Sequence, residues 1–270
     1  MLREAVKEVA EQANQESAVA LAADRRGADR ATVIILLVGA VSLTLGQFLS
    51  RNGMWIVNAL GDVGLAGWSR DVDRAFTTSP HAQFWILVEW AALQVAGYVL
   101  LPMCAIRWLL HQRVRDYGLR VRGIGKFASP YLLLFLAAFP FLFVASYATT
   151  FQSRYPFYDL APHEALWPYL WLWWGCYALQ FVALEFFFRG YLVHGLVPRF
   201  GFMAVFVMAL PYNMLHYGKP MPEALAAIVG GVVLGVLAIR TRSIWWGAAL
   251  HISIAGTIDV LSLWHKGILF

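Results

Sequence analysis

The stretch LEFFFRGYLVHGL, residues 184–196, places a glutamate and an arginine inside an apolar segment. Glu185 and Arg189 are four residues apart, so on a helix their side chains lie on one face, one turn apart, and can form an ion pair. Charged side chains are costly at membrane depth, and where they occur they usually serve a function. Residues 184–196 therefore predict a membrane helix that carries a functional ion pair.

Two histidines follow in later apolar segments, His216 in PYNMLHYG and His251 in WGAALHIS. Histidine is the side chain best suited to proton transfer near neutral pH. A carboxylate, an arginine and two imidazoles on three separate hydrophobic helices predict a reaction centre built inside the bilayer. The simpler interpretation stays open for each: a structural ion pair for Glu185 and Arg189, and hydrogen bonds between helices for His216 and His251.

The composition is that of a membrane protein. Of 270 residues, 60% are hydrophobic and 14% are charged, whereas a soluble domain carries about 25% charged residues. The mean hydropathy is +0.60. The net charge of +5 comes from basic residues in short loops between apolar segments, so it indicates membrane topology and not nucleic-acid binding. We expect an all-α fold, a polytopic bundle of transmembrane helices in a lipid bilayer.

About 20 apolar residues are needed for a helix to cross the hydrocarbon. The apolar segments predict seven crossings, at residues 31–50, 83–106, 129–149, 166–188, 202–217, 223–239 and 244–264. The fourth helix is expected to run on to about Pro198. An eighth crossing at residues 54–67 stays open, although that stretch carries Asn58 and Asp62 and is short, which favours a loop or an interfacial segment.

Loops rich in basic residues alternate with loops that are poor in them. By the positive-inside rule, the basic loops lie on the cytoplasmic side, which gives the orientation of the chain in the membrane. The arginine-rich positions precede the first crossing and follow the second, fourth and sixth: Arg25, Arg26, Arg30, Arg107, Arg113, Arg115, Arg120, Arg122, Lys126, Arg199, Arg240 and Arg242. The prediction is a cytoplasmic N-terminus, in what looks like a bacterial inner membrane. Residues 1–30 are charged throughout and predict a cytoplasmic tail or helix in water or at the headgroups.

Three motifs resemble the CAAX-protease and bacteriocin-processing (CPBP, or Abi) family of glutamic intramembrane proteases. They are Glu185-Phe-Phe-Phe-Arg189-Gly190, Tyr212-Asn-Met-Leu-His216, and the stretch GGVVLGVLAIRTRSIWWGAALHIS, which leads to His251. The run DYGLRVRG, residues 116–123, is similar to the family's entry segment. The resemblance implies a CPBP-type core at residues 116–265, after a tail at 1–30 and N-terminal transmembrane helices at 31–115.

What the resemblance implies is hydrolysis of a peptide bond within or beside the membrane. The substrate would be a membrane protein or peptide, lipid-modified or with a C-terminal sorting tail. Glu185 would be the general base that activates water, Arg189 would orient it, His216 would share the water, and His251 would stabilise the oxyanion. No His-Glu-x-x-His, Gly-x-Ser-Gly or Gly-x-Gly-Asp motif of other intramembrane proteases occurs.

The chain departs from the family pattern at two positions. The family usually has two adjacent glutamates, and the first position here is Leu184; the third motif usually has Asn or Asp four residues after its histidine, and here that residue is Ala255. A catalytically inactive CPBP-like scaffold, or an immunity or regulatory protein, is therefore the alternative function. A transporter is a third, although no inverted repeat is evident.

A metal is the remaining alternative for the site. Glu185, His216 and His251 could together hold a zinc ion with one open water position. The glutamic mechanism that the resemblance implies needs only a water held by glutamate and histidine. We therefore expect no obligatory cofactor, with a divalent metal such as zinc as the alternative.

Overall fold

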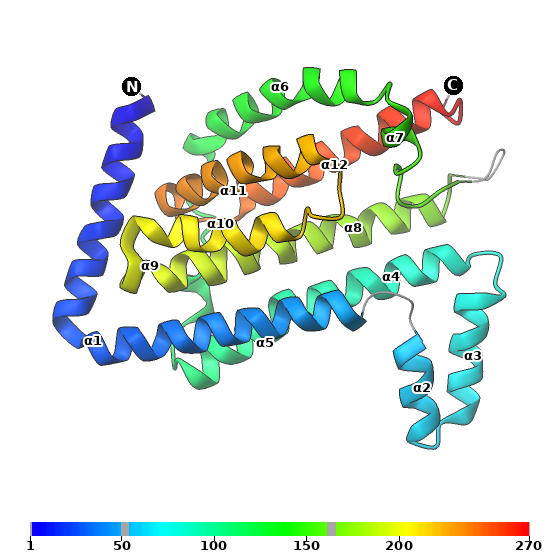
Figure 1. Cartoon of the computed structure of the whole chain (residues 1–270), viewed down its shortest axis with the longest axis horizontal. Helices are drawn as coiled ribbons and strands as arrows, with labels where there is room; N and C mark the ends of the chain where they lie inside the picture. Colours follow the sequence, from blue (N-terminus) through cyan, green and yellow to red (C-terminus); the bar gives the residue numbers. More distant parts are fainter. Residues whose placement is uncertain (1, 50–53, 161–165, 270) are drawn as a thin grey trace. The chain divides into compact units, whose positions relative to one another are not determined.

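The computed structural model describes residues 2–49, 54–160 and 166–269, and these residues are mostly helical (Figure 1). In chain order the elements are α1 (Leu2–Leu49), α2 (Met54–Asp62), α3 (Ala66–Thr77), α4 (Ala82–Val95), η1 (Ala96–Leu100), α5 (Leu101–Cys104), η2 (Ala105–Leu109), η3 (Val114–Asp116), η4 (Gly125–Phe127), α6 (Ala128–Ala145), α7 (Thr149–Gln152), α8 (Tyr169–Glu185), η5 (Phe186–His194), α9 (Gly195–Phe200), η6 (Gly201–Met203), α10 (Ala204–Met214), α11 (Met221–Thr241) and α12 (Trp245–His265). The described residues contain no β-strand, which confirms the all-α prediction.

Six helical segments of the described chain are long and apolar enough to cross a membrane: Arg3–Leu49, Ala82–Leu109, Gly125–Ala145, Tyr169–Met214, Met221–Thr241 and Trp245–His265. The polytopic bundle is therefore confirmed, but with one segment fewer than the seven expected. The fourth and fifth expected crossings both fall in Tyr169–Met214. Its last part, α10, has 11 residues and is about 16 Å long, too short to cross the hydrocarbon alone.

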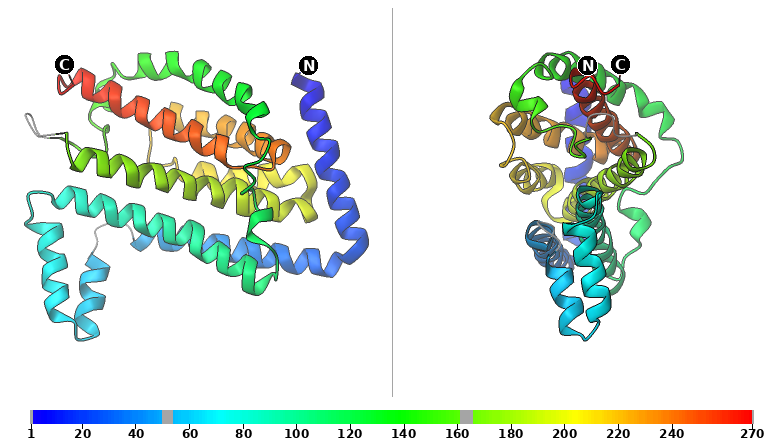
Figure 2. Two further views of the ribbon diagram at one scale, coloured as in Figure 1. Left: turned by 180° about the vertical axis from the view of Figure 1, so that it is seen from behind. Right: turned by 90° about the vertical axis from the view of Figure 1, so that its right-hand side faces the viewer.

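The open question at residues 54–67 is also answered. This stretch forms α2 and the start of α3, which have 9 and 12 residues and pack against each other (Figure 2). Neither is long enough to span a bilayer.

The chain divides into two compact units. Unit 1 comprises residues 1–43, 97–128 and 182–247, and unit 2 comprises residues 44–96, 129–181 and 248–270. In unit 1, α1 bends sharply (Figure 1) at Asp24, whose backbone is not helical. The Asp24 carboxylate accepts a hydrogen bond from the Gly27 backbone N–H and so caps the helix that continues to Leu49.

The part of α1 before the bend is the helix expected near the N-terminus, but it is not solvated on all sides. Val9 and Ala13 are fully buried. The Asn14 side chain accepts a hydrogen bond from the Phe202 backbone N–H at 3.0 Å, and Glu16 pairs with Arg242. Residues 2–23 are therefore fastened to the turns at the ends of α9 and α11.

Two helices that follow each other in the chain, α10 and α11, pack together and against η5 in unit 1. The small residues Ala227, Gly231 and Gly235 of α11 are buried, and a side chain at Gly231 would collide with the Tyr212 ring. Such a stripe allows helix backbones to approach closely. It lets α11 approach α10, which carries Tyr212 and in turn packs against η5.

A second close approach joins the segment at residues 116–123 to η5. A Cβ atom at Gly190 would lie 2.6 Å from the Tyr117 backbone carbonyl oxygen. The same segment forms an isolated antiparallel bridge between Leu119 and Ser243, and its Gly118 carbonyl accepts a hydrogen bond from the Ile244 N–H. Glycine at position 190 is required because a backbone atom, unlike a flexible side-chain tip, cannot move aside.

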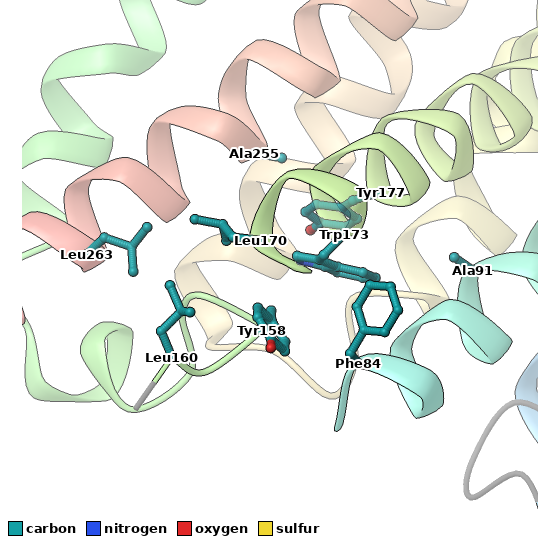
Figure 3. Packing of buried hydrophobic residues seen from close by; sticks show 9 residues of the cluster. All are labelled: Phe84, Ala91, Tyr158, Leu160, Leu170, Trp173, Tyr177, Ala255 and Leu263. Carbon is teal, nitrogen blue, oxygen red and sulfur yellow. The ribbon is translucent and has the colours of Figure 1, made fainter. Parts of the chain in front are cut away.

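Unit 2 has an aromatic core between α4, α8 and α12 (Figure 3), formed by Phe84, Ala91, Tyr158, Leu160, Leu170, Trp173, Tyr177, Ala255 and Leu263. The Trp173 and Tyr177 rings are stacked with centroids 5.0 Å apart. Ala255, where the CPBP pattern places a polar residue, packs within this core.

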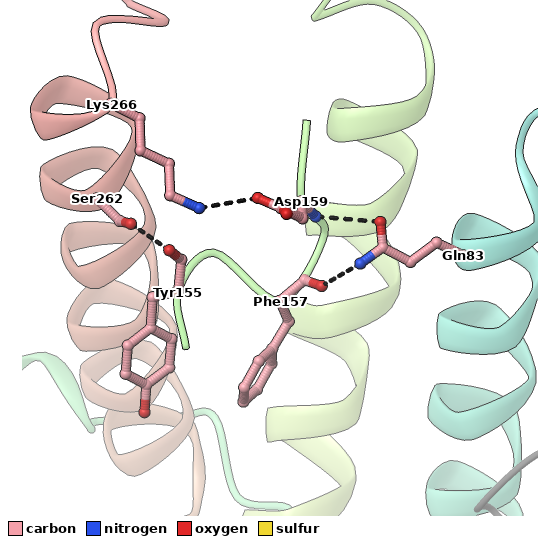
Figure 4. A network of polar contacts seen from close by, with 6 residues as sticks. All are labelled: Gln83, Tyr155, Phe157, Asp159, Ser262 and Lys266. Carbon is pink, nitrogen blue, oxygen red and sulfur yellow. Dashed lines mark hydrogen bonds and ion pairs between the residues drawn. The ribbon is translucent and has the colours of Figure 1, made fainter. Parts of the chain in front are cut away.

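Polar contacts hold the loop before α8 at the edge of this core (Figure 4). Lys266 pairs with Asp159 at 2.8 Å, and the Gln83 side chain bonds to both Phe157 and Asp159. The Ser262 hydroxyl donates to the Tyr155 carbonyl. These bonds attach the loop to α4 through Gln83 and to the C-terminal end of α12 through Ser262 and Lys266.

We predict that Gly190→Ala destabilises the protein by about 1–3 kcal/mol, because the added methyl overpacks against the Tyr117 carbonyl. Thermal unfolding in detergent measures the effect. Gly230→Ala in α11 is the matched control, since no atom lies within 4 Å of a Cβ there and alanine is the better helix former. Equal melting temperatures for the two variants would contradict the argument.

Candidate active site

The predicted ion pair is present and deeply buried. Arg189 Nη1 lies 2.9 Å from Glu185 Oε1, and each side chain is 1% exposed. Glu185 is the last residue of α8, and Arg189 lies in the π-helical segment η5 that follows. The wider turn of a π-helix is often found at functional sites. The helix continues through Pro198 to Phe200, as the sequence predicts.

The second motif supplies an aromatic platform for the arginine. The Arg189 guanidinium carbon lies 4.2 Å from the centre of the Tyr212 ring, a distance typical of a cation–π contact. The Phe188 ring packs edge-on against the same tyrosine. The sequence shows Tyr212 only as the aromatic residue four before His216; its role as the surface that holds Arg189 depends on how α10 packs against η5.

The sequence predicts that His216 lies within a helix, but the structure places it two residues beyond the end of α10. The helix ends at Met214, and the His216 N–H bonds to the Asn213 carbonyl in a tighter turn. The His216 and Tyr212 rings have centroids 5.2 Å apart. The His216 ring nitrogen Nδ1 lies 3.3 Å from the Tyr212 carbonyl oxygen. Contacts therefore link the first motif to the second in one series, from Glu185 through Arg189 and Tyr212 to His216.

A residue that the sequence analysis missed is Gly247, near the start of α12. A Cβ atom there would lie 2.3 Å from Glu185 Oε2 and 3.0 Å from its Cδ. The carboxylate thus turns one oxygen to Arg189 and the other toward the backbone of α12. A glycine four residues before His251 is the one signal in the sequence, and it is weak without knowledge of the packing.

The predicted residue of the third motif, His251, belongs to unit 2. Its ring is stacked on Phe181, with centroids 5.6 Å apart and planes 2° from parallel. His251 follows Gly247 by four residues within α12. Its joint role with Glu185 and His216 stays a prediction.

The expectation of no obligatory cofactor, with a divalent metal such as zinc as the alternative, also stays a prediction. The described residues contain no group of three or more His, Cys, Asp or Glu side chains arranged to hold a metal ion. The set considered for zinc, Glu185, His216 and His251, is distributed over both units.

Comparison with known proteins bears on the same part of the chain. Residues 166–257 match the family described as type II CAAX prenyl endopeptidase Rce1-like. A search of curated proteins found no match, and a search of solved structures found none either. The matched range includes all three motifs, with Glu185, Arg189, His216 and His251. The match confirms the resemblance to the CPBP family over residues 166–257, and the six long apolar helices identify the chain as an integral membrane protein.

Proposed function

We propose that the protein is an intramembrane endopeptidase that hydrolyses a peptide bond in a membrane-associated or lipid-modified protein or peptide. The observation that carries the proposal is the buried Glu185–Arg189 ion pair within the Rce1-like range. Removing two charges from water is expensive unless they are paired and held in place. A carboxylate buried in this way, with one oxygen against arginine and the other beside Gly247, is suited to hold a water molecule.

In the proposed reaction, Glu185 accepts a proton from this water as the water oxygen attacks the scissile carbonyl carbon. His216 shares the water with Glu185, and His251 donates a hydrogen bond to the oxyanion that forms on the carbonyl oxygen. Collapse of the tetrahedral intermediate breaks the C–N bond, and the proton held by Glu185 passes to the leaving amine. Arg189 holds the Glu185 carboxylate in position between turnovers.

The same proposal covers substrate and location. The substrate carries a lipid or a C-terminal sorting tail, the membrane is the bacterial inner membrane, and the N-terminus is cytoplasmic, as the arginine-rich loops predict. The reaction needs no obligatory metal; zinc held by Glu185, His216 and His251 is the alternative.

A specific observation favours a second function, a catalytically inactive scaffold or an immunity or regulatory protein. Both departures from the family pattern are apolar and buried: Leu184 is 9% exposed and Ala255 is 6% exposed. Ala255 also belongs to the core cluster of unit 2. At position 255, where the family pattern has Asn or Asp, this chain thus has a residue that contributes to hydrophobic packing.

We predict that His216→Ala lowers cleavage by about 10²–10⁴-fold, the usual contribution of a proton-transfer group. Glu185→Gln should do the same but also destabilise the fold by about 3–5 kcal/mol, because it leaves Arg189 buried without its counter-charge. Cleavage of a library of membrane-anchored peptides in proteoliposomes, read by mass spectrometry, measures the activity.

Two further variants separate catalysis from folding. Glu185→Gln combined with Arg189→Gln removes both charges, so stability should recover while cleavage does not. Glu223→Gln is the control, since Glu223 pairs with Lys219 at a partly exposed site and should retain full activity. A scaffold would instead keep its cellular phenotype in the His216→Ala and double variants.

We also predict that Gly247→Ala lowers cleavage by about 100-fold, because its methyl displaces the Glu185 carboxylate by about 1 Å. Gly256→Ala, in the same helix, is the control because no atom lies within 4 Å of a Cβ at that position. Cleavage assays of both variants measure the loss of activity, and thermal unfolding of both shows whether the fold is retained. Wild-type cleavage by Gly247→Ala would show that the position of the Glu185 carboxylate against Gly247 has no role.

A further inference from the structure

Helices α2 and α3 of unit 2 form a hairpin, residues 54–77, that lies across the direction of α4 and not along it (Figures 1 and 2). The two helices pack on each other, and the Ser69 hydroxyl donates a hydrogen bond to the Val57 carbonyl at 2.9 Å. Of their 9 and 12 residues, all within the described part of the chain, none is buried. Isolated helices shorter than ~12–15 residues are marginal in water, so the α2–α3 hairpin needs a further contact.

The tip of the hairpin exposes apolar side chains. Val63 is 70% exposed and Trp68 is 68% exposed, and Leu65 between them is also exposed. Leu65 and Trp68 are three residues apart, so they share one side of the start of α3. Arg70 lies about 200° around the helix from Trp68. The hairpin thus has an apolar side and a polar side, and a tryptophan among aliphatic residues is typical of segments at a membrane–water interface.

A contact with α4 sets the depth of the hairpin in the membrane. The Trp55 indole N–H donates to the Glu89 carboxylate at 2.8 Å. Glu89 is the eighth residue of α4, so it lies about 10 Å along that helix from its start. The candidate span Ala82–Leu109 has 28 residues and is about 42 Å long, ~12 Å longer than the hydrocarbon is thick. Centred in the bilayer, it extends about 6 Å beyond the hydrocarbon at each end, which puts Glu89 and Trp55 close to the hydrocarbon boundary.

The chain also enters and leaves the hairpin at the membrane. The candidate span Arg3–Leu49 precedes it and the candidate span Ala82–Leu109 follows it. Four residues separate Leu49 from the start of α2, and four separate the end of α3 from Ala82. A hairpin that lies across α4 at this level runs along the surface of the bilayer and not out into the water.

The charges of the hairpin indicate what kind of attraction holds it there. Residues 54–77 carry three aspartates and two arginines, and Arg74 pairs with Asp71 at 3.2 Å. A segment without an excess of basic residues is not attracted by anionic headgroups. Contact with the membrane must therefore depend on the apolar side chains of the tip.

We propose that the α2–α3 hairpin binds the bilayer surface on the side where α1 ends and α4 begins, with Val63, Leu65 and Trp68 inserted between the headgroups and the acyl chains. Insertion removes the apolar tip from water and supplies the contact that the two short helices lack. Because the hairpin is fastened to α4 by the Trp55–Glu89 hydrogen bond, it also restricts the tilt of α4 in the membrane.

The test uses the full chain in proteoliposomes, with Cys104→Ser and Cys176→Ser as the background and one new cysteine that carries an environment-sensitive fluorophore. A label at Leu65→Cys should emit at shorter wavelength than a label at the control position, Arg70→Cys, on the polar side of α3. Phosphatidylcholine with a spin label near the headgroup should quench the label at position 65 more strongly than lipid with a spin label near the end of the acyl chain. Both lipids should quench the control only weakly.

Two outcomes would overturn the proposal. A label at position 65 that is as exposed to water as the control would show that the tip is not inserted and is left for a protein partner. Quenching that requires phosphatidylglycerol, and is absent in liposomes of phosphatidylcholine alone, would show that charge and not apolar insertion holds the hairpin.

Hydrogen exchange in nanodiscs tests the same contact without a label. The amides of α2 and α3 should exchange slowly in the wild-type chain. Leu65→Gln combined with Trp68→Gln should make their exchange faster, because the short helices lose the contact that stabilises them. Arg70→Gln is the matched control and should keep the wild-type rates, and α4 should be unchanged in all variants. Wild-type exchange in the double variant would refute the role of the tip.

Discussion

The buried ion pair between Glu185 and Arg189 is the constraint on which unit 1 depends. Each side chain is 1% exposed, and a charge buried that deeply is strongly destabilising without its partner. The packing of the neighbouring elements must therefore hold the two side chains together. The Arg189 guanidinium stacks on the Tyr212 ring of α10 in a cation–π contact. The Glu185 carboxylate lies against the backbone of α12 at Gly247. The pair therefore decides how closely three helices pack, and small residues at the contacts make that packing possible.

Glycine has a different use at each of these contacts. At position 190 it admits a backbone carbonyl, which secures the segment at residues 116–123 against η5. At position 247 it leaves room for a carboxylate oxygen, because Glu185 Oε2 lies 2.3 Å from the place that a Cβ atom would take. At both positions the missing side chain lets a neighbouring polar atom lie against the helix backbone.

The two departures from the CPBP pattern can be understood in terms of packing. Leu184 and Ala255 replace polar residues with apolar ones, and both are buried. A chain that has lost a glutamate and an amide in its membrane interior also avoids their desolvation. The Glu185–Arg189 pair carries the same kind of penalty, and the two charges offset it by pairing with each other at 2.9 Å.

The sequence by itself determined the membrane class, the helical architecture and the ion pair, because each depends on local composition or on a four-residue spacing. It also identified three motifs that all lie within the range of the Rce1-like match. Only the tertiary structure decided that α10 stops at Met214, that Tyr212 supports Arg189, and that Gly247 faces Glu185. These features arise between residues far apart in the chain, where periodicity carries no information and only packing brings the side chains together.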